Sequence, residues 1–104
     1  MQLNITGHHI ELTEALRGFI KQKLARLTRH YDNIDNVQVT LSVEKGRKQA
    51  ACLLNVAGKD LHGADERGDM YAAIDSLINK MDRQLVKYKE KVQAHSKGVG
   101  SLGL

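Results

Sequence analysis

The chain has 104 residues, of which 41% are hydrophobic, and this length suits one domain with one core. Basic residues outnumber acidic ones 16 to 12, and the net charge of +4 favours an anionic partner such as nucleic acid or an acidic membrane surface. The single cysteine, Cys52, excludes an internal disulfide, and neither a signal peptide nor a membrane-spanning run of about 18 apolar residues is found. We therefore expect a cytoplasmic protein with no membrane segment.

The first half of the chain predicts a strand, a helix and a second strand. Residues 2–6 alternate polar and apolar, as in a half-buried strand that Gly7 would end. Thr13 can cap the helix that follows, and residues 32–36 are turn-rich and would end it. Residues 37–44 are the clearest strand, with alternate residues facing the core. The apolar stripe of this first helix consists of Leu16, Phe19, Ile20, Leu24, Leu27 and Tyr31.

The second half predicts a meander of strands followed by a long helix. Residues 45–48 form a hairpin turn, residues 49–57 a strand, and residues 61–65 a weak fourth strand. Asp69 can cap a last helix from Met70 to about Val92. Its apolar stripe consists of Met70, Ile74, Leu77, Ile78, Met81, Leu85 and Tyr88.

These elements predict an α+β fold with the order β-α-β-β-β-α. A right-handed crossover would make the first two strands parallel, and short turns would make the remaining pairs antiparallel. One polar face on each strand would place both helices on the same side of a four-stranded mixed sheet. Residues 1–95 would form this domain, and the Gly/Ser-rich residues 96–104 a flexible C-terminal tail.

Basic side chains of the last helix gather on one flank. With about 100° per residue and Met81 at the centre of the apolar stripe, they fall within a sector of roughly 80°, about 120° from that centre. They are Lys80, Arg83, Lys87 and Lys91. Asp75 and Asp82 fall on the opposite flank, whereas Glu90 borders the basic sector and Lys89 lies on the acidic side.

The first helix also carries basic residues on its flanks. Lys23, Arg26 and His30 lie on one flank of its apolar stripe, and Arg17 and Lys21 on the other. Helices lying side by side would form a basic groove suited to a phosphate backbone. Solubility alone explains many exposed charges, but a surface built only for solubility would mix the two signs.

Catalytic and metal-binding patterns are absent from the sequence. His8 and His9 are adjacent in a predicted loop and have no accompanying ligands at zinc spacing. Cys52 alternates with Leu54 on a buried face, which favours a core thiol over a nucleophile. No aromatic residue lies on a strand face, so base stacking on the sheet is not expected, although His62 could face RNA. We therefore expect no enzyme, no catalytic residue, no metal and no cofactor.

Two segments of the sequence resemble a known family. "MQLNITGHHIELTEALRGFIKQKLARL" and "DMYAAIDSLINKMDRQLVKYKEK" are similar to the short form of the ribosome hibernation promoting factor family, which includes the ribosome-associated inhibitor and the sigma-54 modulation protein. The "DMYAAID" stretch, followed by basic residues at 80, 83 and 87, is the most specific match. The resemblance extends to about His95 and implies the same β-α-β-β-β-α order.

The resemblance implies a function based on occupancy. Family members bind the small ribosomal subunit in the channel of messenger RNA and tRNA during stationary phase or stress. The short form acts with ribosome modulation factor to promote inactive ribosome dimers. Contacts with ribosomal RNA would come from Arg17, Lys23, Arg26, Lys80, Arg83 and Lys87, and the flank of the last helix adds Lys91. We expect a monomer when the protein is free.

Three alternatives remain open at this point. A generic double-stranded RNA-binding module would bind free duplexes, whereas a hibernation factor would need the assembled subunit. The ribosome-associated inhibitor paralogue would block translation without dimers, but it has an acidic tail, and residues 96–104 are not acidic. A small enzyme would use His8, His9 or His62.

Overall fold

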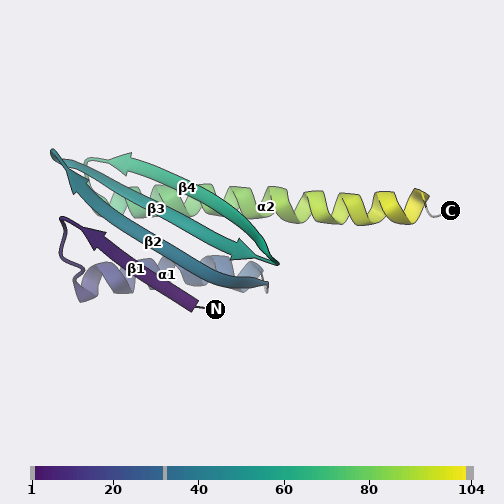
Figure 1. Ribbon diagram of the computed structural model, residues 1–104, viewed down its shortest axis with the longest axis horizontal. Coiled ribbons are helices and arrows are strands. Elements are labelled where there is room, and N and C mark those ends of the chain that lie inside the picture. Colours follow the sequence, from purple (N-terminus) through teal and green to yellow (C-terminus); the bar gives the residue numbers. More distant parts are fainter. Residues whose placement is uncertain (1, 32, 103–104) are drawn as a thin grey trace.

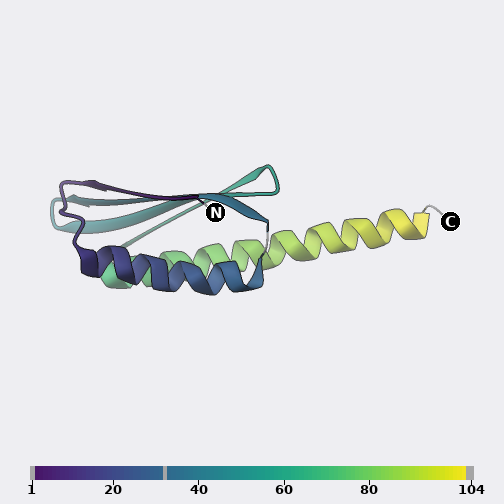
Figure 2. The same ribbon diagram turned by 90° about the horizontal axis from the view of Figure 1, so that it is seen from below.

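A twisted four-stranded sheet lies against two helices, which both cover the same face (Figure 1 and Figure 2). The computed structural model describes residues 2–31 and 33–102, except for the side chains of residue 30 and residues 92–102. The elements follow the predicted order and confirm the α+β fold. They are β1 (Gln2–His8), α1 (Glu14–His30), β2 (Ile34–Glu44), β3 (Arg47–Val56), β4 (Lys59–Arg67) and α2 (Met70–Leu102).

The strands lie in the order β1-β2-β3-β4, with β1 parallel to β2 and the other pairs antiparallel. The predicted parallel first pair and antiparallel meander are therefore confirmed. Each hairpin turns over two residues, Lys45–Gly46 and Ala57–Gly58, and all four have positive φ angles between 50° and 82°. This is the type I′ geometry, whose twist matches the strands and which favours glycine at the second turn position.

The core lies between the sheet and the helices and is entirely apolar among the described residues. Alternate residues of β2, such as Val37, Val39 and Leu41, point into it, as the strand pattern predicts. The predicted helix stripes supply the opposite wall, including Ile20, Leu24, Leu27, Ile74, Leu77, Met81 and Leu85. Phe19, Tyr31 and Tyr88 are half-buried and pack against its margin. The other face of the sheet is open.

Both helices begin at the predicted caps. The Leu16 N–H donates to Thr13 Oγ1 at 3.1 Å, and the Ala72 N–H donates to Asp69 Oδ2 at 3.2 Å. Each bond satisfies a backbone donor that the first turn of a helix leaves without an intrahelical acceptor. These caps set the start of each helix and hence which flank faces its neighbours.

Several strand boundaries predicted from the sequence are wrong by a few residues. β1 continues through Gly7 to His8, because Gly7 pairs with Leu41. Glycine suits this position, since a Cβ atom there would lie 2.9 Å from the Ile10 carbonyl oxygen. β2 begins at Ile34, inside the segment predicted as turn, because Ile34 is buried in the core. β3 begins at Arg47 and β4 spans Lys59–Arg67, since the two-residue turns leave more residues to pair.

The last helix is longer than predicted. Glycine and serine after residue 95, without apolar periodicity, predicted an end near Val92, whereas α2 runs to Leu102 and extends beyond the sheet (Figure 1). The chain contains no proline, so nothing in this segment forces the backbone hydrogen bonding of the helix to stop. The flexibility of residues 96–104 stays a prediction, and residues 103–104 lie outside the described residues.

Candidate nucleic-acid interface

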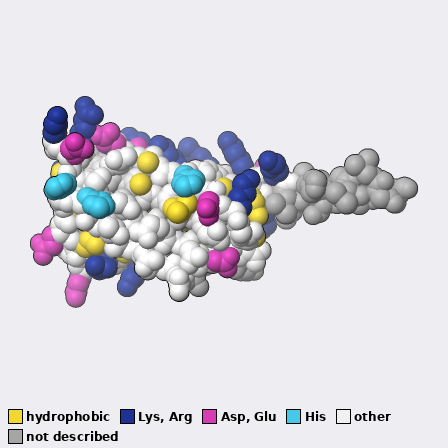
Figure 3. All heavy atoms as spheres, in the orientation of Figure 1, with side chains coloured by type: hydrophobic (Ala, Val, Ile, Leu, Met, Phe, Trp, Pro, Cys, Tyr) yellow, Lys and Arg dark blue, Asp and Glu magenta, His cyan; other side chains and the backbone are white. Residues whose placement is uncertain are grey.

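The four basic residues on one flank of α2 form a surface that we call the basic ridge: Lys80, Arg83, Lys87 and Lys91. All four are exposed. Two α2 side chains show what this flank adjoins: Lys80 Nζ donates to the Ala64 carbonyl at 3.1 Å, and Gln84 Nε2 donates to the His62 carbonyl at 2.6 Å. The basic ridge therefore runs along the outer edge of β4, where Figure 3 shows Lys and Arg side chains in a row.

Three members of the basic ridge are available to a ligand. Within the described part of the chain, Arg83, Lys87 and Lys91 have neither an ion-pair nor a hydrogen-bond partner. Lys80, whose side chain is 46% exposed, also lies 3.6 Å from Asp65 Oδ1. Because an ammonium has three donors, the contacts with Ala64 and Asp65 leave Lys80 one more.

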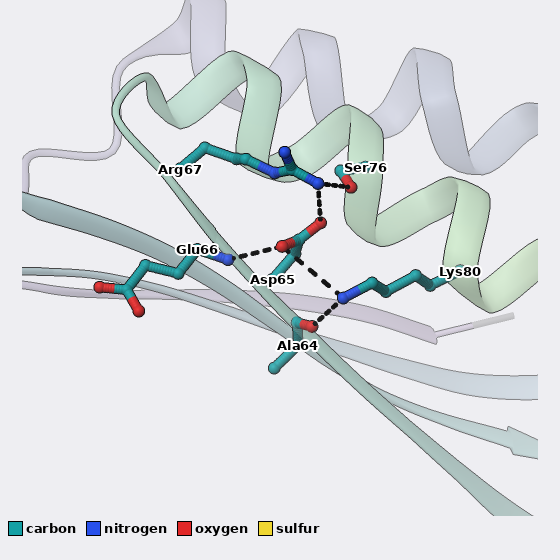
Figure 4. A network of polar contacts seen from close by, with 6 residues as sticks. All are labelled: Ala64, Asp65, Glu66, Arg67, Ser76 and Lys80. Atoms are coloured by element: carbon teal, nitrogen blue, oxygen red, sulfur yellow. Dashed lines mark hydrogen bonds and ion pairs between the residues drawn. The ribbon is translucent and has the colours of Figure 1, made fainter.

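Asp65 organises the start of the basic ridge (Figure 4). Its side chain is only 10% exposed; Oδ1 accepts from the Glu66 N–H at 2.8 Å, and Oδ2 lies 3.3 Å from Arg67. Arg67 also donates to Ser76 Oγ at 3.1 Å, so the network joins β4 to α2. The pKa of Asp65 is lowered to about 2, chiefly by a hydrogen bond from Ser76 and further by those from the Glu66 N–H and Arg67. Asp65 therefore stays ionised beside Lys80 at neutral pH.

Lys23 and Arg26 lie in a different place, between the two helices. Lys23 Nζ pairs with Asp75 Oδ1 at 3.0 Å, and Arg26 donates to Asn79 Oδ1 at 3.0 Å. The prediction of a basic groove between the helices is therefore wrong for α2, because α2 turns its acidic flank toward α1. Helical spacing determines the charge on each flank of α2 but not which neighbour each flank faces.

Arg17, a further predicted contact residue, does not join the basic ridge. Arg17 is exposed on the flank of α1 opposite to Lys23. The side chain of His30 lies outside the described residues. Arg67 was missed by sequence reasoning because it follows a weak strand, yet its contact with Asp65 places it next to Lys80.

Cys52 and the histidines are further candidates from the sequence, and the structure places those that it describes in the fold. Cys52 is buried in the core, and burial raises the pKa of its thiol to about 12, which confirms a core thiol. Among the residues that the structure describes, no three His, Cys, Asp or Glu side chains could hold a metal ion together. His8 ends β1 and so does not lie in the predicted loop, whereas His9 follows it with a φ of 59°. None of the described helices has the length and apolar character to cross a membrane.

Comparison with known proteins identifies the family. The family model described as "Sigma 54 modulation protein / S30EA ribosomal protein" matches residues 3–93. The chain belongs to this family. The ribosome hibernation promoting factor of Escherichia coli K12 is 50% identical over 95 residues, which cover 91% of this chain and all of that protein. The factor of the same name from Azotobacter vinelandii is 48% identical over 91 residues, covering 88% of this chain and 85% of that one.

Solved structures support the same assignment within the S30EA family. A ribosomal subunit interface protein from Coxiella burnetii has a TM-score of 0.82 at 30% identity, covering 86% of this chain and 99% of that one. The N-terminal domain of Thermus thermophilus Protein Y has a TM-score of 0.78 at 29% identity, covering 85% and 99%. The predicted family resemblance is therefore confirmed.

Proposed function

We propose that this chain binds the small ribosomal subunit in the channel of messenger RNA and tRNA and blocks translation by occupancy, without chemistry. Membership of the S30EA family and relatives named ribosome hibernation promoting factor support a role on the ribosome. The observation that carries the RNA contact is the basic ridge, where Arg83, Lys87 and Lys91 are exposed and unpaired among the described residues.

Phosphate groups of ribosomal RNA are the ligands that suit the basic ridge. The Arg83 guanidinium can bind a phosphate with two parallel hydrogen bonds, whereas lysines contribute point charges. On α1, Arg17 would add a contact from one flank. Lys23 and Arg26, which are already bonded to Asp75 and Asn79, would add weaker ones from the other flank. If about six phosphates are neutralised, the log–log dependence of affinity on salt would have a slope of roughly −4 to −5.

In the cell, this binding would store ribosomes in the cytoplasm during stationary phase or stress. The chain would act jointly with ribosome modulation factor to promote inactive ribosome dimers, and it would be a monomer before it binds. Relatives named ribosome hibernation promoting factor support the storage of ribosomes, whereas the joint action, the dimers and the free monomer come from the family resemblance. Sedimentation of ribosomes with each factor alone and with both together tests it: a dimer peak that needs both is the expected result.

The first experiment measures co-sedimentation with small subunits, large subunits and a free RNA duplex at two salt concentrations. The test variant is Lys80→Glu/Arg83→Glu/Lys87→Glu. The matched control, Arg29→Glu/Lys45→Glu/Lys89→Glu, reverses three exposed charges outside the basic ridge. We expect saturable binding to the small subunit, a loss of roughly 100-fold or more in the test variant, and little change in the control.

Two results would contradict the proposal. Equal binding to every RNA would indicate a generic double-stranded RNA-binding module. Equal weakening in the test and control variants would mean that only net charge matters and that the basic ridge is an ordinary solvated helix face.

A further inference from the structure

The open face of the sheet is nearly uncharged at its centre. The register places Asn4, Gln38, Leu53 and His62 in one row across the four strands, and Thr6, Thr40, Ala51 and Ala64 in the next. Figure 3 shows this face as mostly uncharged side chains, with Lys and Arg gathered at its edges. This absence of charge contrasts with a chain in which 27% of residues are charged.

His62 stands beside a shallow hollow on this face. The hollow has a volume of about 440 Å³, and its lining includes Gln38, Thr40, Ala51, Leu53, His62 and Ala64. The alanines are short and leave a flat floor, while Leu53 is 36% exposed and adds apolar surface. His62 projects outward because Leu61 and Gly63, its neighbours along β4, face the helices. A planar ring, an apolar side chain and the Gln38 amide thus border one small surface.

The strand that carries His62 also borders the flank of α2 that carries the basic ridge. The backbone carbonyl of His62 accepts the 2.6 Å hydrogen bond from Gln84, which follows Arg83 directly in α2. An RNA strand with its phosphates on the basic ridge would therefore have its bases within reach of the open face. A phosphate would not enter this face, since its charged members along β4 include Asp60 and Glu66.

From this arrangement we infer that His62, Leu53 and Gln38 form a subsite for an unpaired nucleobase of the RNA that the basic ridge binds. The base would stack on the imidazole and Leu53, and the side-chain carbonyl of Gln38 would contact its edge, because Gln38 Nε2 already donates to Thr6 Oγ1 at 3.1 Å. Leu53 is the only large exposed apolar side chain on the described strands. One such side chain is too small an apolar area for the centre of a protein interface. This inference rests on the proposed function and adds to it a contact that does not depend on phosphate charge.

The test measures small-subunit binding of His62→Ala, His62→Phe and the control His8→Ala across a salt series. Stacking on one base predicts roughly 10-fold weaker binding for His62→Ala, with the salt slope of the wild type, because no phosphate contact is lost. His62→Phe should restore affinity, and His8→Ala should match the wild type. Thermal unfolding of each variant confirms that the fold is kept.

A photo-crosslinking residue in place of His62 identifies what covers the hollow. Crosslinks to an unpaired ribosomal RNA nucleotide are expected, and crosslinks to ribosomal protein alone would overturn the inference. Unchanged affinity of His62→Ala, a changed salt slope, or failure of His62→Phe to rescue would overturn it as well. Loss of wild-type binding to the subunit would instead reject the proposed function, and the subsite with it.

Discussion

The flank of α2 that faces α1 and the flank that faces β4 use their charged side chains in different ways. Toward α1, Asp75 and Asn79 are bonded to Lys23 and Arg26, so charge and hydrogen-bonding capacity are used inside the protein. Toward β4, only Lys80 of the basic ridge is held, by Ala64 and Asp65. One helix therefore fixes the position of its partner helix with one flank and offers cations to a ligand with the other.

A count of basic residues therefore overstates the surface that is available to RNA. A lysine already paired at 3.0 Å must exchange one anion for another, which gains little, whereas an unpaired arginine gains a new charge-assisted bond.

Gly63→Ala should break the packing of β4 on α2 that supports the β4-facing flank. A methyl group at Gly63 would lie 2.5 Å from Met81 Sδ and 3.4 Å from Leu77 Cδ1, so the core must shift. Overpacking of this kind lowers the free energy of unfolding by about 1–3 kcal/mol, measurable by urea denaturation. Gly68→Ala is the matched control because a methyl there meets nothing within 4 Å. Equal stability of the two variants would mean that β4 and α2 are not tightly packed.

Arg83→Ala and Lys23→Ala should separate the two flanks in binding to small subunits. Arg83→Ala should weaken binding roughly 5- to 10-fold and reduce the magnitude of the salt slope by about 1, because it removes an unpaired cation. Lys23→Ala should weaken binding less than Arg83→Ala does, since Asp75 already neutralises Lys23. A loss for Lys23→Ala as large as that for Arg83→Ala would contradict the distinction between the flanks.

Low pH should decrease the free energy of unfolding, because it protonates Asp65 beside the β4-facing flank. The pKa of this carboxyl is about 2 in the folded protein and 3.8 ordinarily, so between pH 4 and pH 2 the unfolded chain takes up a proton that the folded chain does not. Stability should fall with pH through that window, and its contribution should be complete above pH 4. Unfolding of Asp65→Asn against pH should lose this part of the slope, whereas Asp35→Asn should keep it.

The ion pair between the helices should contribute the smallest effect. A double-mutant cycle with Lys23→Ala and Asp75→Ala should give a coupling of about 0.2–1 kcal/mol in the free energy of unfolding, because both side chains are partly exposed. The coupling should shrink at high salt. A coupling that is absent at low salt would show that the pair does not hold the helices together.

Local signals in the sequence predicted most of the fold. Thr13 and Asp69 cap helices by their own chemistry, and the alternation in residues 37–44 is set by the pleat, so neither depends on distant residues. The sorted charges of α2 were predicted for the same reason, because helical spacing is local. The boundary at Gly7 was not predicted, since the need for glycine arises from its approach to Ile10 and Leu12 across a turn.

The pairing of the charged flanks could not be predicted from the sequence. Lys80 meets Asp65 and Lys23 meets Asp75 only once the fold places β4 and α1 on opposite sides of α2. The sequence predicted that His62 could face RNA, but not which side chains would surround it. Its proximity to Leu53 and Gln38 comes from the register of three strands.

The bonds from Lys80 and Gln84 to β4 have a consequence for self-association. β4 is an edge strand, and the outward carbonyls of Ala64 and His62 are the acceptors that an added strand from another molecule would use. Both are already occupied by side chains of α2, one of which carries a positive charge that repels a second copy. With these two acceptors occupied, β4 offers less to an added strand, which disfavours association through this edge of the sheet.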